Sequence, residues 1–354
     1  MHVVLNKIKD DGTVVNLRIN GDVFSCNGCV NYERIVNMFS NFDLISLKFF
    51  PPKNCIMLKL KPLDYTYCDD ISSKLDLFSI TLGDVMNYCK ITEKNCLCLS
   101  ESWIPYAWSV IRSKEKFNIE HLTVIHIDDH SDLMSPFISY SNTWQYDLFT
   151  KKGVQLSNPN SVKDAIKSGA ITIGSMLTPI ISSVNNVKIL HLKQSFVEKR
   201  QFEIMFESIV DDSFYKMVQR FNIRYIPVDV RYGFNNLYME VSDVSDLFQF
   251  VDERSKVILH IDMDYFNNRF NGSTSWKHDI RSSHDPSIDI QRKVIVNLCK
   301  KLGELNDLKH IDYVFVGVSP SFYPSEFWRD GLYCLFENLI DNGINVMDIF
   351  EFIK

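Results

Sequence analysis

Residues 121–136, HLTVIHIDDHSDLMSP, constrain the fold of this chain more than any other stretch. They begin with an apolar run typical of a buried parallel strand and then place Asp128, His130 and Asp132 on alternate residues. Because side chains alternate along an extended strand, the three point to one face. Two carboxylates and an imidazole at a strand end can bind a divalent metal. The alternative is an acidic loop whose aspartates cap a following helix.

A second stretch has the same design. Residues 257–266, VILHIDMDYF, form an apolar run that ends in the alternating carboxylates Asp262 and Asp264. Each stretch also carries a histidine two residues before its first aspartate, namely His126 and His260. We expect these histidines below the ligands, as interior or orienting groups. Two strand ends of one design predict one shared site.

Strand-like and helix-like stretches alternate from about residue 95 onward, which predicts a mainly parallel sheet covered by helices on both faces. The expected strands include residues 96–99, 122–127, 171–174, 187–192, 223–230, 257–261, 313–318 and 344–349. The expected helices are residues 104–114, 162–167, 202–221, 241–251, 290–305 and 326–339. Ligands of such sheets gather beyond the carboxyl ends of the strands, where both acidic motifs fall.

Residues 1–90 differ in character from residues 91–354. Short strands over residues 13–19, 22–30 and 55–60 and a helix over residues 32–39 predict a small α+β appendage to the main domain. The appendage contains a lone C-x-x-C, Cys26 to Cys29. A zinc site would need two further ligands at similar spacing, and the central Asn-Gly pair favours a hairpin turn. We assign these cysteines no metal.

Composition excludes several classes of protein. The chain has 354 residues, of which 45% are hydrophobic and 23% charged, as in soluble globular proteins. The sequence has no apolar run of membrane-spanning length and no signal-peptide core at its start, so we predict a cytoplasmic protein without membrane contact. A formal charge of -6 argues against nucleic-acid binding and is compatible with a cationic substrate. The nine irregularly spaced cysteines indicate reduced thiols.

The two acidic motifs resemble those of the arginase-type ureohydrolases, which hold two manganese ions with a D-x-H-x-D motif and a later D-x-D motif. The resemblance covers residues 97–328 and is strongest to the arginase-related family that includes peptide arginases of bacterial ribosomal-peptide (RiPP) maturation. It implies a three-layer αβα arginase-like fold, two Mn²⁺ ions, and hydrolysis of arginine to ornithine and urea. The family pattern makes Asp128 and Asp262 bridging ligands, with His130 and Asp264 on one ion and Asp132 on the other.

One ligand of the family pattern has no match. Arginases take a further histidine from a G-G-D-H-S setting before the first motif, whereas residues 99–103 of this chain read LSESW. Glu101 is the expected substitute, because a carboxylate is an adequate manganese ligand. The other interpretation is that this ion has fewer protein ligands and more water.

Three further residues are expected to act on the substrate. The shuttle histidine that follows the first motif in arginases has no counterpart in residues 141–144, so His278 or His284 is predicted to move the proton. Both lie in the loop after the second motif, at the edge where substrate contacts collect. Glu326 follows the last central strand and is a candidate to hold the guanidinium. The alternative is an ordinary glutamate in the first turn of a helix.

The preferred hypothesis is therefore a metal-dependent hydrolase of linear amidines, acting on arginine within a precursor peptide. In that case residues 1–90 would recognise the peptide's leader by strand addition. A second hypothesis is an amidohydrolase, deacetylase or agmatinase-like enzyme, although the chain lacks the adjacent histidine pair of the deacetylases. A third is a non-catalytic binding protein of the same fold, which would have to keep buried carboxylates without a cation, at high cost.

Overall fold

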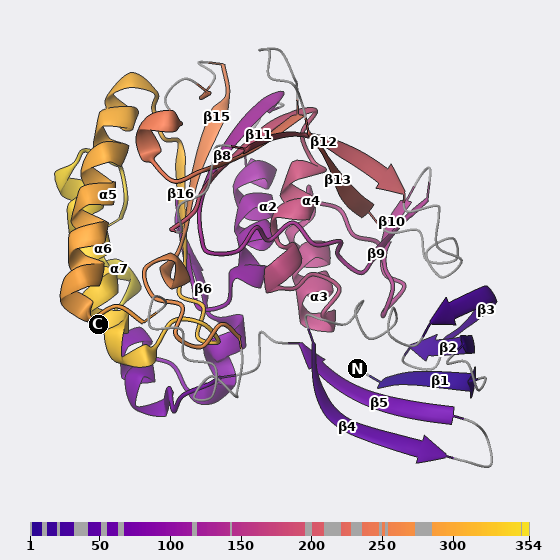
Figure 1. Ribbon diagram of the computed structural model, residues 1–354. Helices are drawn as coiled ribbons and strands as arrows, with labels where there is room; N and C mark the ends of the chain where they lie inside the picture. The colour runs from indigo at the N-terminus through magenta and orange to yellow at the C-terminus, as the bar shows by residue number, and fades with distance from the viewer. Residues whose placement is uncertain are drawn as a thin grey trace.

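A nine-stranded sheet forms the centre of the structure, a computed structural model of the full chain (Figure 1). The residues that the structure describes are 2–8, 13–19, 22–31, 42–50, 55–62, 67–114, 119–141, 144–194, 200–208, 221–227, 236–247, 250–251, 254–272, 285–347 and 349–353. The strand order of the nine-stranded sheet is β13-β12-β14-β11-β8-β15-β16-β7-β6. The strands are β6 (Cys89–Ile91), β7 (Asn95–Cys98), β8 (His121–Ile127), β11 (Asn186–Leu192), β12 (Arg200–Ser208), β13 (Phe221–Pro227), β14 (Asn236–Val241), β15 (Lys256–Asp262) and β16 (Tyr313–Gly317).

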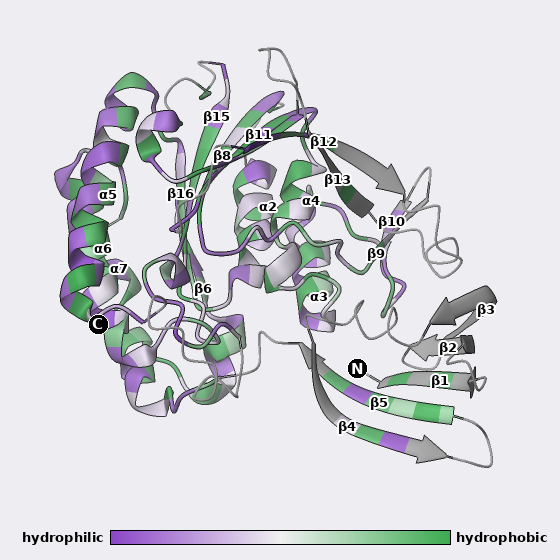
Figure 2. Cartoon of the chain, in the orientation of Figure 1, coloured by the Kyte–Doolittle hydropathy of each residue, from purple (hydrophilic) through white to green (hydrophobic). Residues whose placement is uncertain are grey.

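The middle of this sheet is parallel and its edges are antiparallel. Strands β14, β11, β8, β15, β16 and β7 pair in parallel, whereas β12 pairs antiparallel with both β14 and β13, and β6 antiparallel with β7. The long apolar runs of the sequence form the middle strands, which are buried on both faces. Figure 2 shows hydrophobic residues along β15.

Helices cover both faces of the sheet. One face packs against α2 (Ile104–Lys114), α3 (Pro159–Ser168) and α4 (Leu177–Ile181), and the other against α5 (Ile288–Leu308), α6 (Trp328–Asp341) and α7 (Ile349–Phe352). Residues of β8 alternate between the two apolar clusters, with Val124 in the first and Ile125 in the second. The predicted α/β fold, a mainly parallel sheet between helical layers, is confirmed.

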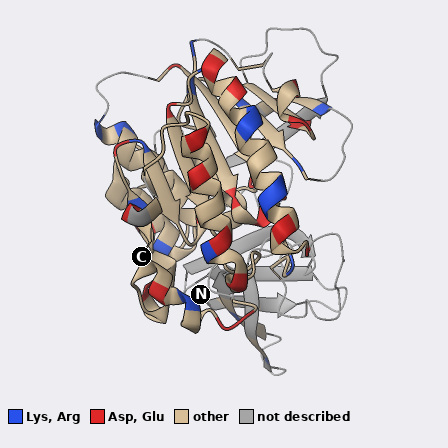
Figure 3. Ribbon diagram, turned by 90° about the vertical axis from the view of Figure 1, so that its left-hand side faces the viewer, with Lys and Arg blue, Asp and Glu red and all other residues tan. Residues whose placement is uncertain are grey.

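The helical layers are amphipathic. In α5, the buried residues Ile295, Leu298 and Leu302 follow helical spacing toward the sheet. On the outer side of this layer, charged residues of both signs are interspersed (Figure 3). Among the described helices, none combines the length and apolarity needed to cross a membrane.

The N-terminal strands form a separate antiparallel sheet of order β3-β2-β1-β5-β4. These strands are β1 (His2–Ile8), β2 (Thr13–Ile19), β3 (Asp22–Asn31), β4 (Phe42–Phe50) and β5 (Cys55–Pro62). The predicted strands over residues 13–19, 22–30 and 55–60 are therefore confirmed. The buried side chains of Leu5 and Leu58 join the apolar cluster that contains α2 and α3.

The segment between the two sheets packs with the main domain. Leu75 and Phe78 of η3 (Ser72–Phe78) and Val85 of η4 (Leu82–Asn87) lie in the apolar cluster that contains α5 and α6. The division of the chain at residue 90 stays a prediction. The helix expected over residues 32–39 lies outside the described residues.

Several local predictions are wrong. Asn27 and Gly28 lie inside β3, where pairing with β2 continues on both sides of a register shift, so this pair forms no hairpin turn. The helix predicted for residues 202–221 is wrong over its first part, because β12 is a strand there, while residues 209–220 lie outside the described part.

Three shorter predictions also fail. The strand expected at residues 171–174 is a bend that leads into η6 (Ile173–Ser175). The helix expected at residues 241–251 is the end of β14 followed by the short η7 (Val244–Asp246). Residues 344–347 form no strand, and the chain ends in α7 instead. A two-stranded hairpin of β9 (Ile138–Ser141) and β10 (Trp144–Asp147) was not predicted.

Candidate metal centre

The two acidic motifs leave the sheet side by side. Strands β8 and β15 are parallel neighbours, with His126 opposite His260 and Ile127 opposite Ile261. The next residues on the two strands, Asp128 and Asp262, therefore emerge at the same level of the carboxyl edge. The structure thus brings together the strand ends that the sequence predicted to share a site.

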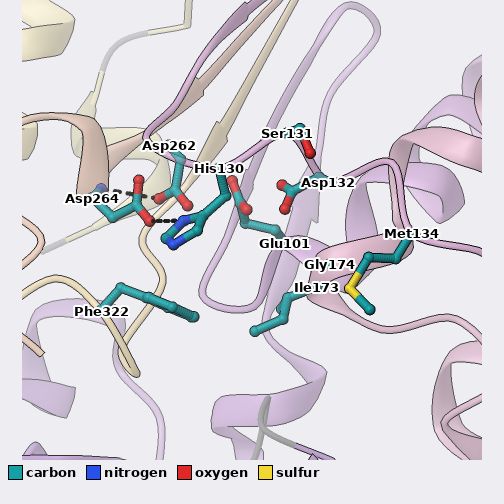
Figure 4. Close-up of a pocket in the computed structure, with 10 residues that line it drawn as sticks. All are labelled: Glu101, His130, Ser131, Asp132, Met134, Ile173, Gly174, Asp262, Asp264 and Phe322. Atoms are coloured by element: carbon teal, nitrogen blue, oxygen red, sulfur yellow. Dashed lines mark hydrogen bonds and ion pairs between the residues drawn. The ribbon is translucent and has the colours of Figure 1, made fainter. Parts of the chain in front are cut away.

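A cavity of about 280 Å³ opens at this edge (Figure 4). It is lined by Glu101, His130, Ser131, Asp132, Met134, Ile173, Gly174, Asp262, Asp264 and Phe322. In Figure 4 the carboxylates of Glu101 and Asp132 point toward one another, with Met134 and Ile173 on one side and Phe322 on the other. The cavity therefore combines an acidic floor with apolar walls.

Three carboxylates form the first cluster, which we call the Glu101 group: Glu101, Asp128 and Asp262. Each offers an oxygen within 4.8 Å of the others, and all three side chains are buried. Burial, and then the neighbouring carboxylates, raise the pKa of each well above its usual range. Burial also raises the pKa of the adjacent Asp132 to about 7, although His130 opposes this shift. So many buried carboxylates require a cation to ionise together.

The oxygen atoms of this cluster are short of partners. Among the described residues, Glu101 Oε1, Asp128 Oδ2 and Asp132 Oδ2 are buried and have no hydrogen-bond partner. Leaving such atoms unpaired is costly, and divalent cations are bound by oxygen atoms of this kind. The donor set therefore fits a metal ion.

The second cluster, which we call the His130 group, consists of Asp128, His130 and Asp264. His130 Nδ1 lies 2.9 Å from Asp264 Oδ2 and 3.7 Å from Asp128 Oδ1. Burial disfavours the charged ring, but Asp264 and Asp128 together raise the pKa of His130 well above its usual value. Since Asp128 belongs to both clusters, the two can hold a pair of ions that share one carboxylate.

Residues around the His130 group fix the imidazole. His130 Nε2 lies 3.4 Å from Asn271 Oδ1, and its ring meets Phe322 edge-on at a centroid distance of 5.0 Å. A carbonyl oxygen at Nε2 favours the tautomer that leaves Nδ1 free to bind a metal. Asn271 thereby orients the ligand.

Backbone and hydroxyl donors orient the carboxylates. Asp128 Oδ1 accepts a hydrogen bond from the backbone N–H of His130 at 2.6 Å, and Asp262 Oδ1 accepts one from Asp264 at 3.1 Å. The hydroxyl of Ser319 donates to Asp262 Oδ2 at 2.8 Å. These are the short loops between side chain and backbone that aspartate forms readily, and they leave the other oxygen atom of Asp128 free.

Backbone geometry at the site is unusual. Asp132 and Ser319 have left-handed φ angles of 49° and 52°. Conformations of this kind persist where the surroundings enforce them, and they collect at functional sites. At Gly317 an added Cβ would lie 2.5 Å from Glu101 Cγ and Oε1, so glycine at this position makes room for Glu101.

A pair of buried histidines lies beneath the carboxylates. His126 Nδ1 and His260 Nδ1 are 2.8 Å apart, and His126 Nε2 lies 3.0 Å from the backbone oxygen of His130. His260 Nε2 lies 3.0 Å from Glu101 Oε1. Burial lowers the pKa of both rings, that of His260 to about 3. The sequence predicted both as interior histidines, and their mutual contact follows from the register of the two strands.

A third buried histidine was missed. His191 on β11 lies opposite His126 in the sheet. Its Nε2 is 3.1 Å from the backbone oxygen of Asp128, and its Nδ1 is 2.7 Å from the hydroxyl of Tyr238. The signal was present, since residues 187–192, VKILHL, are an apolar run with a histidine near its end, as in the two motif strands.

Of the three residues predicted to act on the substrate, Glu326 alone belongs to the described part of the structure. The Glu326 side chain is 53% exposed, forms an ion pair with Arg269 at 2.8 Å, and does not line the cavity. Its position therefore favours the alternative, a glutamate at the start of a helix, over a contact with the guanidinium. His278 and His284 lie outside the described residues, so their roles stay predictions.

Comparisons with known proteins add a distant structural similarity. No protein-family model and no curated protein sequence matches the chain. Among solved structures, the crystal structure of the arginase from Helicobacter pylori is similar over 78% of this chain and 80% of that chain, with a TM-score of 0.31 and 12% identity. Similarity at this level does not define a family for the chain.

Proposed function

We propose that this chain is a hydrolase that uses two divalent metal ions to cleave the guanidinium group of arginine, releasing urea and leaving ornithine. The observation that carries the proposal is a set of three ligand clusters that share Asp128, namely the Glu101 group, the His130 group and the buried trio of His126, Asp128 and His260. Three buried carboxylate oxygens at this place lack a hydrogen-bond partner among the described residues. A pair of divalent ions supplies a water-derived nucleophile near neutral pH.

The residues divide between the ions as follows. Glu101 and Asp132 would bind the first ion and His130 and Asp264 the second, with Asp128 shared. Asp262 belongs to the Glu101 group and is our second candidate for a ligand common to both ions. A set of mostly carboxylate ligands with an imidazole suits Mn²⁺, which is the metal we propose.

The cavity suits a guanidinium. Carboxylate oxygens of its floor that do not bind an ion can accept hydrogen bonds from a planar group with several N–H donors. The aromatic ring of Phe322 offers a stacking surface, while Met134 and Ile173 can pack against a methylene chain.

We further propose that the arginine lies within a ribosomally made precursor peptide. Among the described residues that line the cavity, none is a lysine or arginine that would pair with the α-carboxylate of a free amino acid. Met134, 41% exposed at the cavity, offers apolar surface to the neighbouring residues of a chain. His278 and His284 remain our candidates for donating a proton to the leaving amine.

The test is to load the protein with Mn²⁺ and supply an arginine-containing peptide, free arginine, agmatine and an acetylated lysine peptide. We expect urea and ornithine from the peptide, and none from the Asp262→Asn variant. Acetate from the acetylated peptide would favour a deacetylase. Bound metal without turnover of any of these substrates would contradict the proposal and favour a binding protein.

A further inference from the structure

The Glu101 group is in contact with His260, a buried histidine to which the proposed division of residues between the ions assigns no role. His260 precedes Asp262 by two residues on β15, so both side chains leave the strand on one face. His260 Nε2 lies 3.0 Å from Glu101 Oε1, and the two side chains are 0% and 3% exposed. Despite this distance the pair is not a hydrogen bond, and neither atom has a hydrogen-bond partner among the described residues.

The contacts of His126 and His260 fix which ring nitrogen of each carries the hydrogen atom. His126 Nε2 faces the backbone oxygen of His130, which only accepts, so Nε2 carries the hydrogen. A buried neutral ring then has a lone pair at Nδ1. His260 Nδ1, 2.8 Å away, must donate to that lone pair. A neutral His260 is therefore left with an unprotonated Nε2.

An unprotonated nitrogen and a carboxylate oxygen at this distance repel one another unless a proton shared in a hydrogen bond or a metal cation offsets the repulsion, and this contact does not have the geometry of a hydrogen bond. In an octahedral site with bonds of about 2.1 Å, ligand atoms at neighbouring corners lie about 3 Å apart. Two ligands of one ion point at the ion and not at each other. This agrees with a short contact between His260 and Glu101 that is not a hydrogen bond.

We infer that His260 Nε2 is a direct ligand of the ion held by the Glu101 group. The inference rests on the proposed function only in requiring that the site binds metal. It gives the first ion an imidazole from β15, a source different from the residues before the first motif where arginases carry theirs. His126 is then a positioning residue, since it holds His260 in the tautomer that can bind metal.

Pulsed electron paramagnetic resonance of bound Mn²⁺ tests this directly, because a coordinated imidazole nitrogen gives a characteristic ¹⁴N coupling. The deciding sample is the His130→Gln variant, which removes the imidazole of the His130 group and leaves His260 in place. We expect this variant to bind Mn²⁺ with the ¹⁴N coupling still present. Bound Mn²⁺ without that coupling would overturn the inference while leaving the proposed metal site intact.

Metal stoichiometry provides a second measurement. We expect His260→Gln to lower the affinity of the first site for Mn²⁺ at least about tenfold. The variant should then retain one Mn²⁺ per chain, whereas the unmodified protein should hold two. His191→Gln is the matched control, because His191 is equally buried but contacts a backbone oxygen and a tyrosine hydroxyl. Equal losses in both variants would mean a structural role and contradict the inference. If the unmodified protein binds no Mn²⁺, the proposed function itself fails.

Discussion

The two halves of the metal centre are built differently. The Glu101 group lies inside the protein, at the ends of strands of the central sheet, and its three side chains are buried. In the His130 group, the His130 side chain is 36% exposed and meets Asn271 and Phe322, which lie in loops beyond the strands. The rigid sheet would therefore hold the first of the proposed ions, whereas the second would lie where loops and solvent reach it.

This difference predicts different behaviour of the two ions. An ion surrounded by buried carboxylates leaves only when those carboxylates regain protons or the sheet opens. An ion beside a partly exposed imidazole exchanges with solvent more easily. We expect the Glu101 group to retain metal longest during chelation and the His130 group to lose it first.

Replacing the shared ligand should have the largest effect. Asp128→Asn removes a carboxylate from both groups, so we expect both ions to be lost and urea release to fall at least about a hundredfold, since a catalytic metal contributes several kcal/mol. Metal analysis and a urea assay on the same preparation measure this. A variant that keeps two ions would show that the groups do not share Asp128.

Gly317→Ala should damage only the Glu101 group. The new Cβ would lie 2.5 Å from Glu101 Cγ, so Glu101 must move, at a cost of about 1–3 kcal/mol in the free energy of unfolding. We expect one Mn²⁺ per chain to remain. Gly83→Ala is the control, because its nearest contact would be 3.8 Å away. Two ions retained by Gly317→Ala would mean that Glu101 is not a ligand.

The metal-free protein should lose stability as the pH rises. Burial raises the pKa of Asp132 from 3.8 to about 7, so the folded state holds a proton that the unfolded state has released. This contribution is fully present below the unfolded pKa and is lost as the pH rises through about 7. We expect Tm to be a few degrees lower at about pH 8 than at about pH 5.5.

Two comparisons sharpen that measurement. Asp132→Asn should reduce the pH dependence of Tm, and added Mn²⁺ should restore stability at the higher pH because the ion takes the place of the protons. A metal-free protein with the same Tm at both pH values would contradict the assignment of these buried carboxylates.

The smallest effect is expected at the edge of the His130 group. Asn271→Ala removes the oxygen that lies 3.4 Å from His130 Nε2. Because this contact is long and exposed to solvent, we expect the affinity of the second site for Mn²⁺ to fall by about tenfold or less. Calorimetric titration with Mn²⁺ resolves the two sites. A loss confined to the tighter site would reverse our assignment of the groups.

The centre of the sheet was predictable and its edge was not. Strands β8 and β15 follow from uninterrupted apolar runs, because a strand buried on both faces needs no alternation. Strand β12 was predicted as a helix, although Phe202 and Ile204 alternate as in a strand. This segment is a strand because it pairs antiparallel with β13 and β14, and such pairing with distant segments cannot be seen in the local sequence.

Those ligands of the site that follow from the alternation of side chains along a strand were predictable from the sequence. Asp128, Asp262 and Asp264 follow from strand ends, and the structure brings them together. His260 was predicted to lie below the ligands, as an interior or orienting histidine, and its contact with Glu101 was not predicted. Its closeness to the site depends on Glu101, at the start of η5 (Glu101–Trp103) just after β7, reaching across Gly317, a contact between distant parts of the chain.

The alignment of His126 with His260 across β8 and β15 has a consequence for assembly of the protein. A shift of one residue would turn every side chain of one strand to the opposite face and disperse the donor atoms. Only molecules that have joined these strands correctly can capture the ions. Binding of the proposed metal ions would therefore stabilise only the correctly aligned fold.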